Sequence, residues 1–181
     1  MLFRSVSKYE NRSQTIELCG QASGWRMKPY ADSNFFTKFY LVLPASELAT
    51  DLLDDARRQN APPLPVTWLH RLEVVNALQQ QVFASRVYGN PRITPEQAAV
   101  AQASFRDDLG RSDFFCAMQL PLERIANKFE DVSLRQTARH GFRTYDIIHV
   151  ASALLLGCDT FWSFDMKASR LAKLEGLKTR Q

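Results

Sequence analysis

The chain has 181 residues, of which 45% are hydrophobic and 23% are charged, and its formal net charge is +4. This size and apolar content fit one globular domain with a buried core. No segment approaches the roughly 18 consecutive apolar residues of a membrane span, and the first residues lack a hydrophobic stretch of signal-peptide length. The three cysteines include no C-x-x-C pair, which favours a reducing compartment. We therefore expect a soluble, cytoplasmic protein whose mildly basic charge permits a polyanionic partner without requiring one.

The first 26 residues show neither a two-residue nor a 3.6-residue hydrophobic period. Met27 is followed directly by a strand-like segment. We therefore expect residues 1–26 to be an N-terminal extension and residues 27–181 to be the domain. The extension is either an over-called start or a genuine ordered arm.

Strand-like and helical patterns alternate after Met27. The expected strands are Lys28–Asp32, Leu64–Val66, Phe114–Met118 and Thr160–Ser163. One helix is expected directly after the first strand, and the next covers Ala45–Asn60. A long helix begins at Thr67, with Leu69, Leu72 and Leu78 on its apolar face, and another is opened by Thr94–Gln97. The last three expected helices are Leu122–His140, Thr144–Leu156 and Asp165–Glu175. This order predicts an α/β fold in which helices cover a mostly parallel sheet.

Four carboxylates lie within or beside apolar runs. Asp32 ends the first strand, Glu73 lies in the long helix, Asp146 lies in the first turn of a helix, and Asp165 follows the last expected strand. An unpaired buried charge costs several kcal/mol, so such residues need partners. Three of the four fall at junctions expected to share one edge of the sheet, where strands lead into helices, and Glu73 could lean over that edge. Acids so close would repel one another, and a divalent cation with oxygen ligands is the usual remedy.

Each of these acids also has a purely structural explanation. Asp32 could cap the helix that follows it, and the helix dipole favours Asp146 and Asp165 in a first turn. Glu73 could pair with a nearby arginine. The functional interpretation therefore depends on all four side chains meeting in one place.

The motifs around these acids resemble those of PIN-domain ribonucleases, and most closely the VapC toxins of bacterial toxin-antitoxin pairs. The resemblance covers Met27 to about Leu177. The matching motifs are YADSNFF at Tyr30–Phe36, VTWLHRLEVVNAL around Glu73, the spacing R-x-x-D-x-x-H-x-A-x-A at Arg143, Asp146, His149, Ala151 and Ala153, and Ser163-Phe164-Asp165 after a strand.

The resemblance implies a three-layer α/β/α domain that hydrolyses single-stranded or looped RNA with Mg2+ or Mn2+. Asp32, Asp146 and Asp165 would bind the metal directly, and Glu73 would bind it through water or act as a base. It further implies a small antitoxin as partner, and we also expect a homodimer. The alternatives are a housekeeping PIN nuclease and a PIN module that binds without catalysis.

Three further residues are candidates for supporting roles. Asn34 and Ser163 would orient the acids by hydrogen bonds, and Arg143 could steer a phosphate. For each of them, local capping or an ordinary salt bridge is an equally good explanation.

Other chemistries lack their sequence signatures. The three histidines do not have the spacing of a zinc motif, and we expect His149 to be a structural histidine on an apolar helix face. There is no G-x-G-x-x-G, P-loop or G-x-S-x-G motif. The basic end of the last helix could receive RNA, but a solvated face is the preferred interpretation. We expect Phe35, Phe36, Phe39 and Tyr40 to pack in the core or at a dimer surface.

Overall fold

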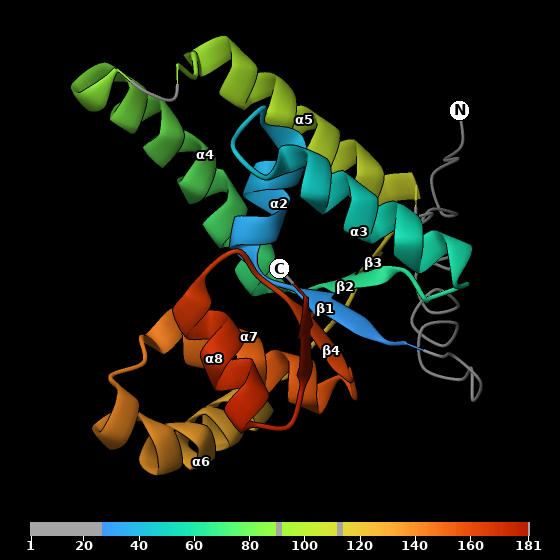
Figure 1. Cartoon of the computed structure of the whole chain (residues 1–181), viewed down its shortest axis with the longest axis vertical. Helices are drawn as coiled ribbons and strands as arrows, with labels where there is room; N and C mark the ends of the chain where they lie inside the picture. The colour runs from blue at the N-terminus through green and yellow to red at the C-terminus, as the bar shows by residue number, and fades with distance from the viewer. Residues whose placement is uncertain (1–26, 90–91, 112–113, 181) are drawn as a thin grey trace, which may run out of the picture.

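The computed structural model describes residues 27–89, 92–111 and 114–180, so the expected extension at 1–26 lies outside the described residues. Helices and strands alternate along most of the chain (Figure 1). The strands are β1 (Pro29–Ala31), β2 (Leu64–Val66), β3 (Phe115–Ala117), β4 (Thr160–Trp162) and β5 (Lys178–Arg180). The helices are α2 (Ser33–Tyr40), α3 (Ser46–Arg58), α4 (Trp68–Tyr88), α5 (Pro95–Arg111), α6 (Leu122–His140), α7 (Thr144–Leu155) and α8 (Met166–Leu174).

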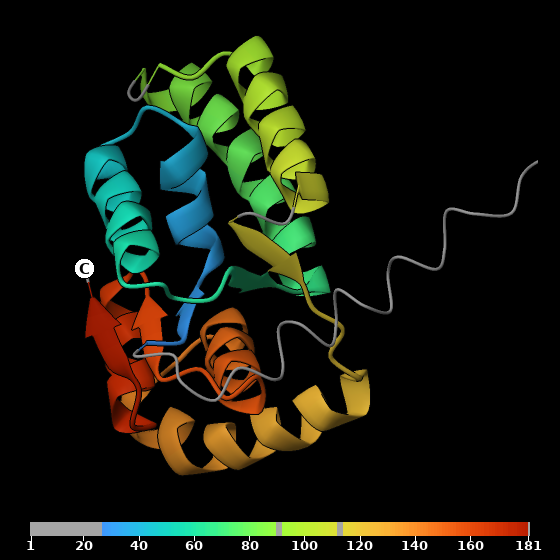
Figure 2. The ribbon, with the colours of Figure 1, turned by 90° about the vertical axis from the view of Figure 1, so that its right-hand side faces the viewer.

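Every strand pairing in the described chain is parallel, as expected. One sheet has the order β1-β4-β5, and the second pairs β2 with β3. Since β2 lies beside β1, the two sheets continue each other. Figures 1 and 2 show the strands between two groups of helices, with α2 to α5 on one side and α6 to α8 on the other. The fold is therefore an α/β fold with helices on both faces of a parallel sheet.

Alternating side chains on the strands build a core on each face of this sheet. Tyr30 of β1 and Phe161 of β4 are fully buried in the core formed with α6, α7 and α8. Their neighbours Ala31 and Trp162 are buried in the opposite core, formed largely by α2 to α5. The two-residue period sends successive side chains to opposite faces of the sheet. Because Ala31 and Trp162 are register partners, the carboxyl ends of β1 and β4 lie side by side.

The helix boundaries follow the capping signals in the sequence. Thr94 and Gln97 form reciprocal hydrogen bonds of 3.2 and 2.9 Å at the start of α5. Gly141 ends α6 in the left-handed conformation, at φ 66°, which glycine adopts without steric strain. The turn that follows leads directly into α7.

Two details differ from the expectations. Strand β5 was not predicted, because its three residues are largely charged and exposed, as suits an edge strand that lacks apolar alternation. Leu72 does not belong to the apolar face of α4, since 64% of its surface is exposed, whereas Leu69 and Leu78 are buried as expected. Phe35 and Phe36 are fully buried, and Phe39 and Tyr40 pack against the same core. In the described part of the chain, no helix combines the length and apolar character needed to cross a membrane.

Candidate active site at the carboxyl ends of the strands

Asp32 and Asp165 lie at the carboxyl ends of β1 and β4 and are joined by Ser163. The backbone N–H of Asp32 donates to the carbonyl of Trp162 at 3.1 Å, which continues the strand pairing up to the acid. The Ser163 hydroxyl donates to Asp32 Oδ2 at 2.5 Å and accepts from the Asp165 backbone N–H at 2.9 Å. Ser163 therefore holds two acids that lie 133 positions apart in the chain in one local arrangement.

Both acids also cap a helix, as the structural explanation proposed. Asp32 Oδ1 accepts from the Phe35 backbone N–H at 3.0 Å at the start of α2. Asp165 Oδ1 accepts from the Lys167 backbone N–H at 2.7 Å at the start of α8. Capping therefore accounts for one oxygen of each carboxylate. It does not account for the burial of Asp32, which is 5% exposed.

Asp146 lies in the first turn of α7, where its Oδ2 accepts from the Arg143 backbone N–H at 3.2 Å. The expectation that it follows a strand is wrong in detail, because α7 follows α6 through a short turn. Burial raises the pKa of Asp146, the Arg143 N–H opposes that rise, and the charge of Asp165 adds to it. Asp146 is therefore close enough to Asp165 for the two charges to repel each other.

The charge of Asp165 also acts on Asp32. Burial raises its pKa from 3.8 to about 6, against the opposing effects of His149, Ser163 and the Phe35 N–H, and the charge of Asp165 raises it further. The charge of Asp165 therefore raises the pKa of both Asp32 and Asp146. That these acids form one catalytic site remains a prediction of the sequence analysis.

Glu73 is joined to these acids by His149. Its carboxylate hydrogen-bonds with His149 Nε2 and accepts from the Ser33 hydroxyl at 2.7 Å. On the other side of the ring, His149 Nδ1 lies 2.9 Å from the Tyr30 hydroxyl. Burial alone would raise the pKa of Glu73, but the hydrogen bonds from His149 and Ser33 and the attraction of His149 outweigh it and hold that pKa below its ordinary value. Among the described residues, the basic side-chain partner of Glu73 is this histidine and not the arginine that the sequence analysis considered.

A second buried histidine supports the first. The Thr67 backbone N–H donates to His70 Nδ1 at 3.0 Å, and His70 Nε2 lies 2.7 Å from the carbonyl oxygen of Ala31. Burial lowers the pKa of His70 well below its ordinary value, so the neutral ring accepts on Nδ1 and donates from Nε2. The rings of His70 and His149 lie 4.9 Å apart. His70 therefore fixes the start of α4 against the last residue of β1.

The donor set fits a hard divalent cation in its chemistry, because carboxylate oxygens are the ligands that Mg2+ and Mn2+ prefer. In the geometry of residues 27–89, 92–111 and 114–180, however, no three His, Cys, Asp or Glu side chains already form a metal-binding group. The carboxylates instead point to their own hydrogen-bond partners. Ligation would require some of them to turn from these local partners toward one another.

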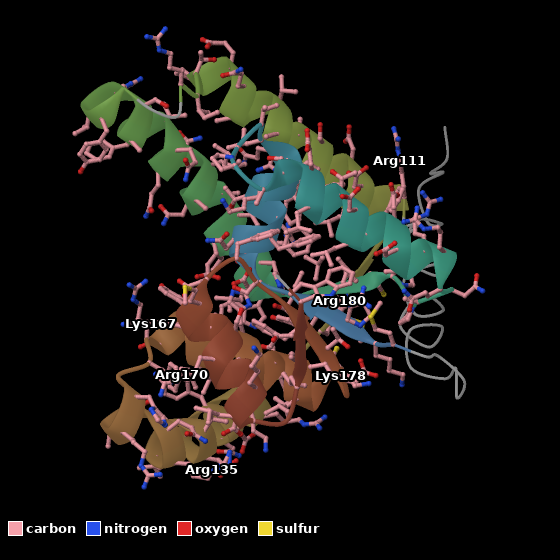
Figure 3. The ribbon with its side chains drawn as sticks, in the orientation of Figure 1. Arg111, Arg135, Lys167, Arg170, Lys178 and Arg180 are labelled. Atoms are coloured by element: carbon pink, nitrogen blue, oxygen red, sulfur yellow. The ribbon has the colours of Figure 1, made fainter. Side chains whose placement is uncertain are left out.

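A groove of about 1030 Å³ is lined by residues of α2, α4 and the start of α7. Glu73 lies in its wall, and so do the supporting candidates Asn34 and Arg143. Ser163 instead contacts the acids directly. Lys167 and Arg170 extend from α8, the helix that begins after Asp165 (Figure 3).

His149 is the residue whose importance the sequence analysis underestimated. It is buried and hydrogen-bonded, as expected of a structural histidine, but its partners include one of the four acids. Its position three residues after Asp146 was visible in the motif. The spacing could not reveal that its partners come from β1, α2 and α4.

The raised pKa of Asp32 predicts a pH-dependent cost to stability. Because the ionised form is disfavoured in the folded protein, stability falls as the pH rises from 3.8 through about 6. With divalent ions removed by EDTA, Asp32→Asn should be more stable than the wild type by roughly 3 kcal/mol at about pH 7.5, and by much less at about pH 4. Urea unfolding of both proteins across this pH range measures the difference. A stability difference between the two proteins that does not change with pH would contradict the raised pKa of Asp32.

Removing His149 should destabilise the fold. His149→Ala leaves a cavity and removes one hydrogen-bond partner each from Tyr30 and Glu73, so we expect a loss of roughly 3 kcal/mol in the free energy of unfolding. His149→Gln can still donate to Glu73 and should lose less. His140→Ala is the matched control on a less buried histidine, with an expected effect within about 0.5 kcal/mol. Equal losses of unfolding free energy for His149→Ala and His140→Ala in chemical denaturation would show that the hydrogen bonds of His149 do not stabilise the protein.

No family model matches the chain, and the search of curated proteins also finds no match. Among solved structures, the chain is similar to VapC20 of Mycobacterium tuberculosis, a sarcin-ricin loop cleaving toxin. The TM-score is 0.56, and the match covers 85% of this chain and 100% of that chain. The sequences are 12% identical, so the similarity is one of fold. The chain has a PIN-like α/β fold, as the resemblance implied.

Proposed function

We propose that this chain is a Mg2+- or Mn2+-dependent endoribonuclease that acts as the toxin of a toxin-antitoxin pair. The observation that supports the proposal is that Asp165 raises the pKa of both Asp32 and Asp146. Ser163 also hydrogen-bonds with Asp32 and Asp165, and His149 hydrogen-bonds with Glu73. Capping explains each acid separately, but it does not explain why acids from separate parts of the chain share one electrostatic environment. The similarity in fold to a ribonuclease toxin supports the same function.

The acids would hold the ion with Asp32, Asp146 and Asp165 as direct ligands. A bound Mg2+ supplies charge stabilisation at the phosphate and lowers the pKa of a water molecule. Ser163 keeps one oxygen of Asp32 in place, and the backbone N–H of Arg143 does the same for Asp146. Because some carboxylates would have to turn to reach a common ion, these contacts would restrict how far Asp32 and Asp146 can turn.

Glu73 would act on the attacking water. Its hydrogen bonds with His149 and Ser33 keep its pKa low, so the carboxylate is ionised near neutral pH and can orient or accept a proton. Glu73 and Arg143 both line the groove, where the guanidinium would hold a substrate phosphate. The scissile phosphodiester would therefore lie between Glu73 in the groove wall and the ion held by the three aspartates.

Purified protein should cut RNA only when Mg2+ or Mn2+ is present. Asp146→Asn removes a ligand and one charge, and we expect cleavage to fall by at least about 100-fold. Asp107→Asn is the matched control, since Asp107 is an exposed acid of α5, and it should cut like the wild type. Gel analysis of total RNA incubated with each protein, with and without metal, measures the effect.

The outcome also separates the alternatives. A protein that cuts no RNA with either ion would be a PIN module used for binding. Equal cleavage by the wild type and Asp146→Asn would refute the catalytic assignment of this acid. Cleavage without any effect on growth would favour a housekeeping nuclease in RNA processing.

The toxin role implies partners in the cytoplasm: an RNA substrate, a small antitoxin protein and a second copy of the chain. Expression of the wild type should arrest bacterial growth, and Asp146→Asn should relieve the arrest at equal protein levels. A short reading frame upstream of the gene, when co-expressed, should restore growth and co-purify with the protein. Growth arrest by Asp146→Asn at full strength would contradict a catalytic toxin. Light scattering measures whether the purified chain is a homodimer.

A further inference from the structure

The groove beside Glu73 is built on one face of α4. The α4 residues that line it recur at intervals of three or four positions, namely Trp68, Leu69, Leu72, Glu73, Asn76, Ala77, Gln80 and Gln81. This spacing keeps them on one side of the helix. From Leu69 to Gln80 the face extends roughly 16 Å along the helix axis. The groove therefore leads away from the proposed catalytic acid along a straight wall.

Four uncharged amides contribute to the polar part of this wall. Asn76, Gln80 and Gln81 come from α4, and Asn34 faces them from α2. An amide side chain carries both a donor and an acceptor, which is the pairing that a nucleobase edge presents. Among the described residues that line the groove, Glu73 is the sole acid. The surface beyond it therefore has no carboxylate to repel a phosphate chain.

Aromatic and cationic groups complete the lining near Glu73. Trp68 is 38% exposed and Tyr145 is 57% exposed, so each ring can accept a stacked base. Arg143 lies in the same wall and can contact phosphate. Amides, exposed rings and a guanidinium together match the surface of an unpaired nucleotide. A duplex would not fit this chemistry as well, because paired bases hide the edges that amides read.

We propose that this groove reads the bases of single-stranded RNA next to the cleaved phosphate, with Asn76 and Gln80 as specificity-determining residues. The proposal rests on the proposed nuclease function for its substrate class. It also accounts for the exposure of Leu72, which lies between Leu69 and Asn76 on the same wall and offers an apolar surface to a base. A protein segment that occupies the groove is the competing occupant.

The test compares base preference in binding, so that it does not depend on cleavage. Full-length Asp146→Asn protein is mixed with a pool of random single-stranded RNA in EDTA, and the bound fraction is sequenced. The Asn76→Ala and Gln80→Ala substitutions are then added together in the same background. The matched control is Gln79→Ala, because Gln79 is an exposed amide of α4 that does not line the groove.

We expect Asp146→Asn protein and the Gln79→Ala control to enrich the same short sequence. The Asn76→Ala and Gln80→Ala pair should lose about tenfold or more of the discrimination at one or two positions. An unchanged preference would overturn the proposal, and so would binding without any preference in the parent protein. If the Asn76→Ala and Gln80→Ala pair keeps the RNA preference but no longer binds the antitoxin, the groove is instead the binding site of the protein partner.

Cleavage by the otherwise wild-type protein is measured separately. If that protein cuts RNA in Mg2+ and the amide variants keep its sequence preference, the nuclease function stands and the base-reading groove fails. If no RNA is cut but the bound pool depends on Asn76 and Gln80, the groove stands and the nuclease function fails.

Discussion

The hydrogen bonds of His149 are the interaction on which the rest of this site depends. One buried ring contacts Tyr30 of β1, Ser33 of α2 and Glu73 of α4 while it is carried by α7. A buried polar network of this kind is costly when it is incomplete and rigid when every member has a partner. Because the ring joins four elements, the position of Glu73 relative to the edge of the sheet is fixed by the core and not by a flexible surface loop.

The aspartates illustrate how a charged site is maintained inside a small domain. Each carboxylate has a local donor, which is a helix N-terminus for Asp32, Asp146 and Asp165. These donors offset only part of the cost, since the pKa of Asp32 remains raised to about 6. A cation would remove the remaining repulsion, whereas a purely structural cap would have no need of a neighbouring acid. Under the proposed function, the unfavourable burial of Asp32 would serve metal binding and not stability.

Most of the fold follows from local signals in the sequence, because caps and glycines determine where helices begin and end. Gly141 and the Thr94–Gln97 capping box predicted the boundaries they now form. The acids were found because carboxylates in apolar runs are unusual. The sequence could not predict β5, whose charged residues lack alternation. It also could not predict the partners of His149, since contacts across 76 to 119 positions depend on how the helices pack.

Under the proposals above, helix α4 would connect the chemistry of the site to its selectivity. Its buried residues, such as Val74 and Leu78, pack into the core, while Glu73, Asn76 and Gln80 share the face that lines the groove. Since side chains three and four positions apart lie on the same face, a rotation of α4 would move the acid and the amides together. His70 prevents that rotation by binding the carbonyl of Ala31, directly before Asp32. The same contact that orients the helix on the sheet therefore sets the distance between the acidic edge and the groove.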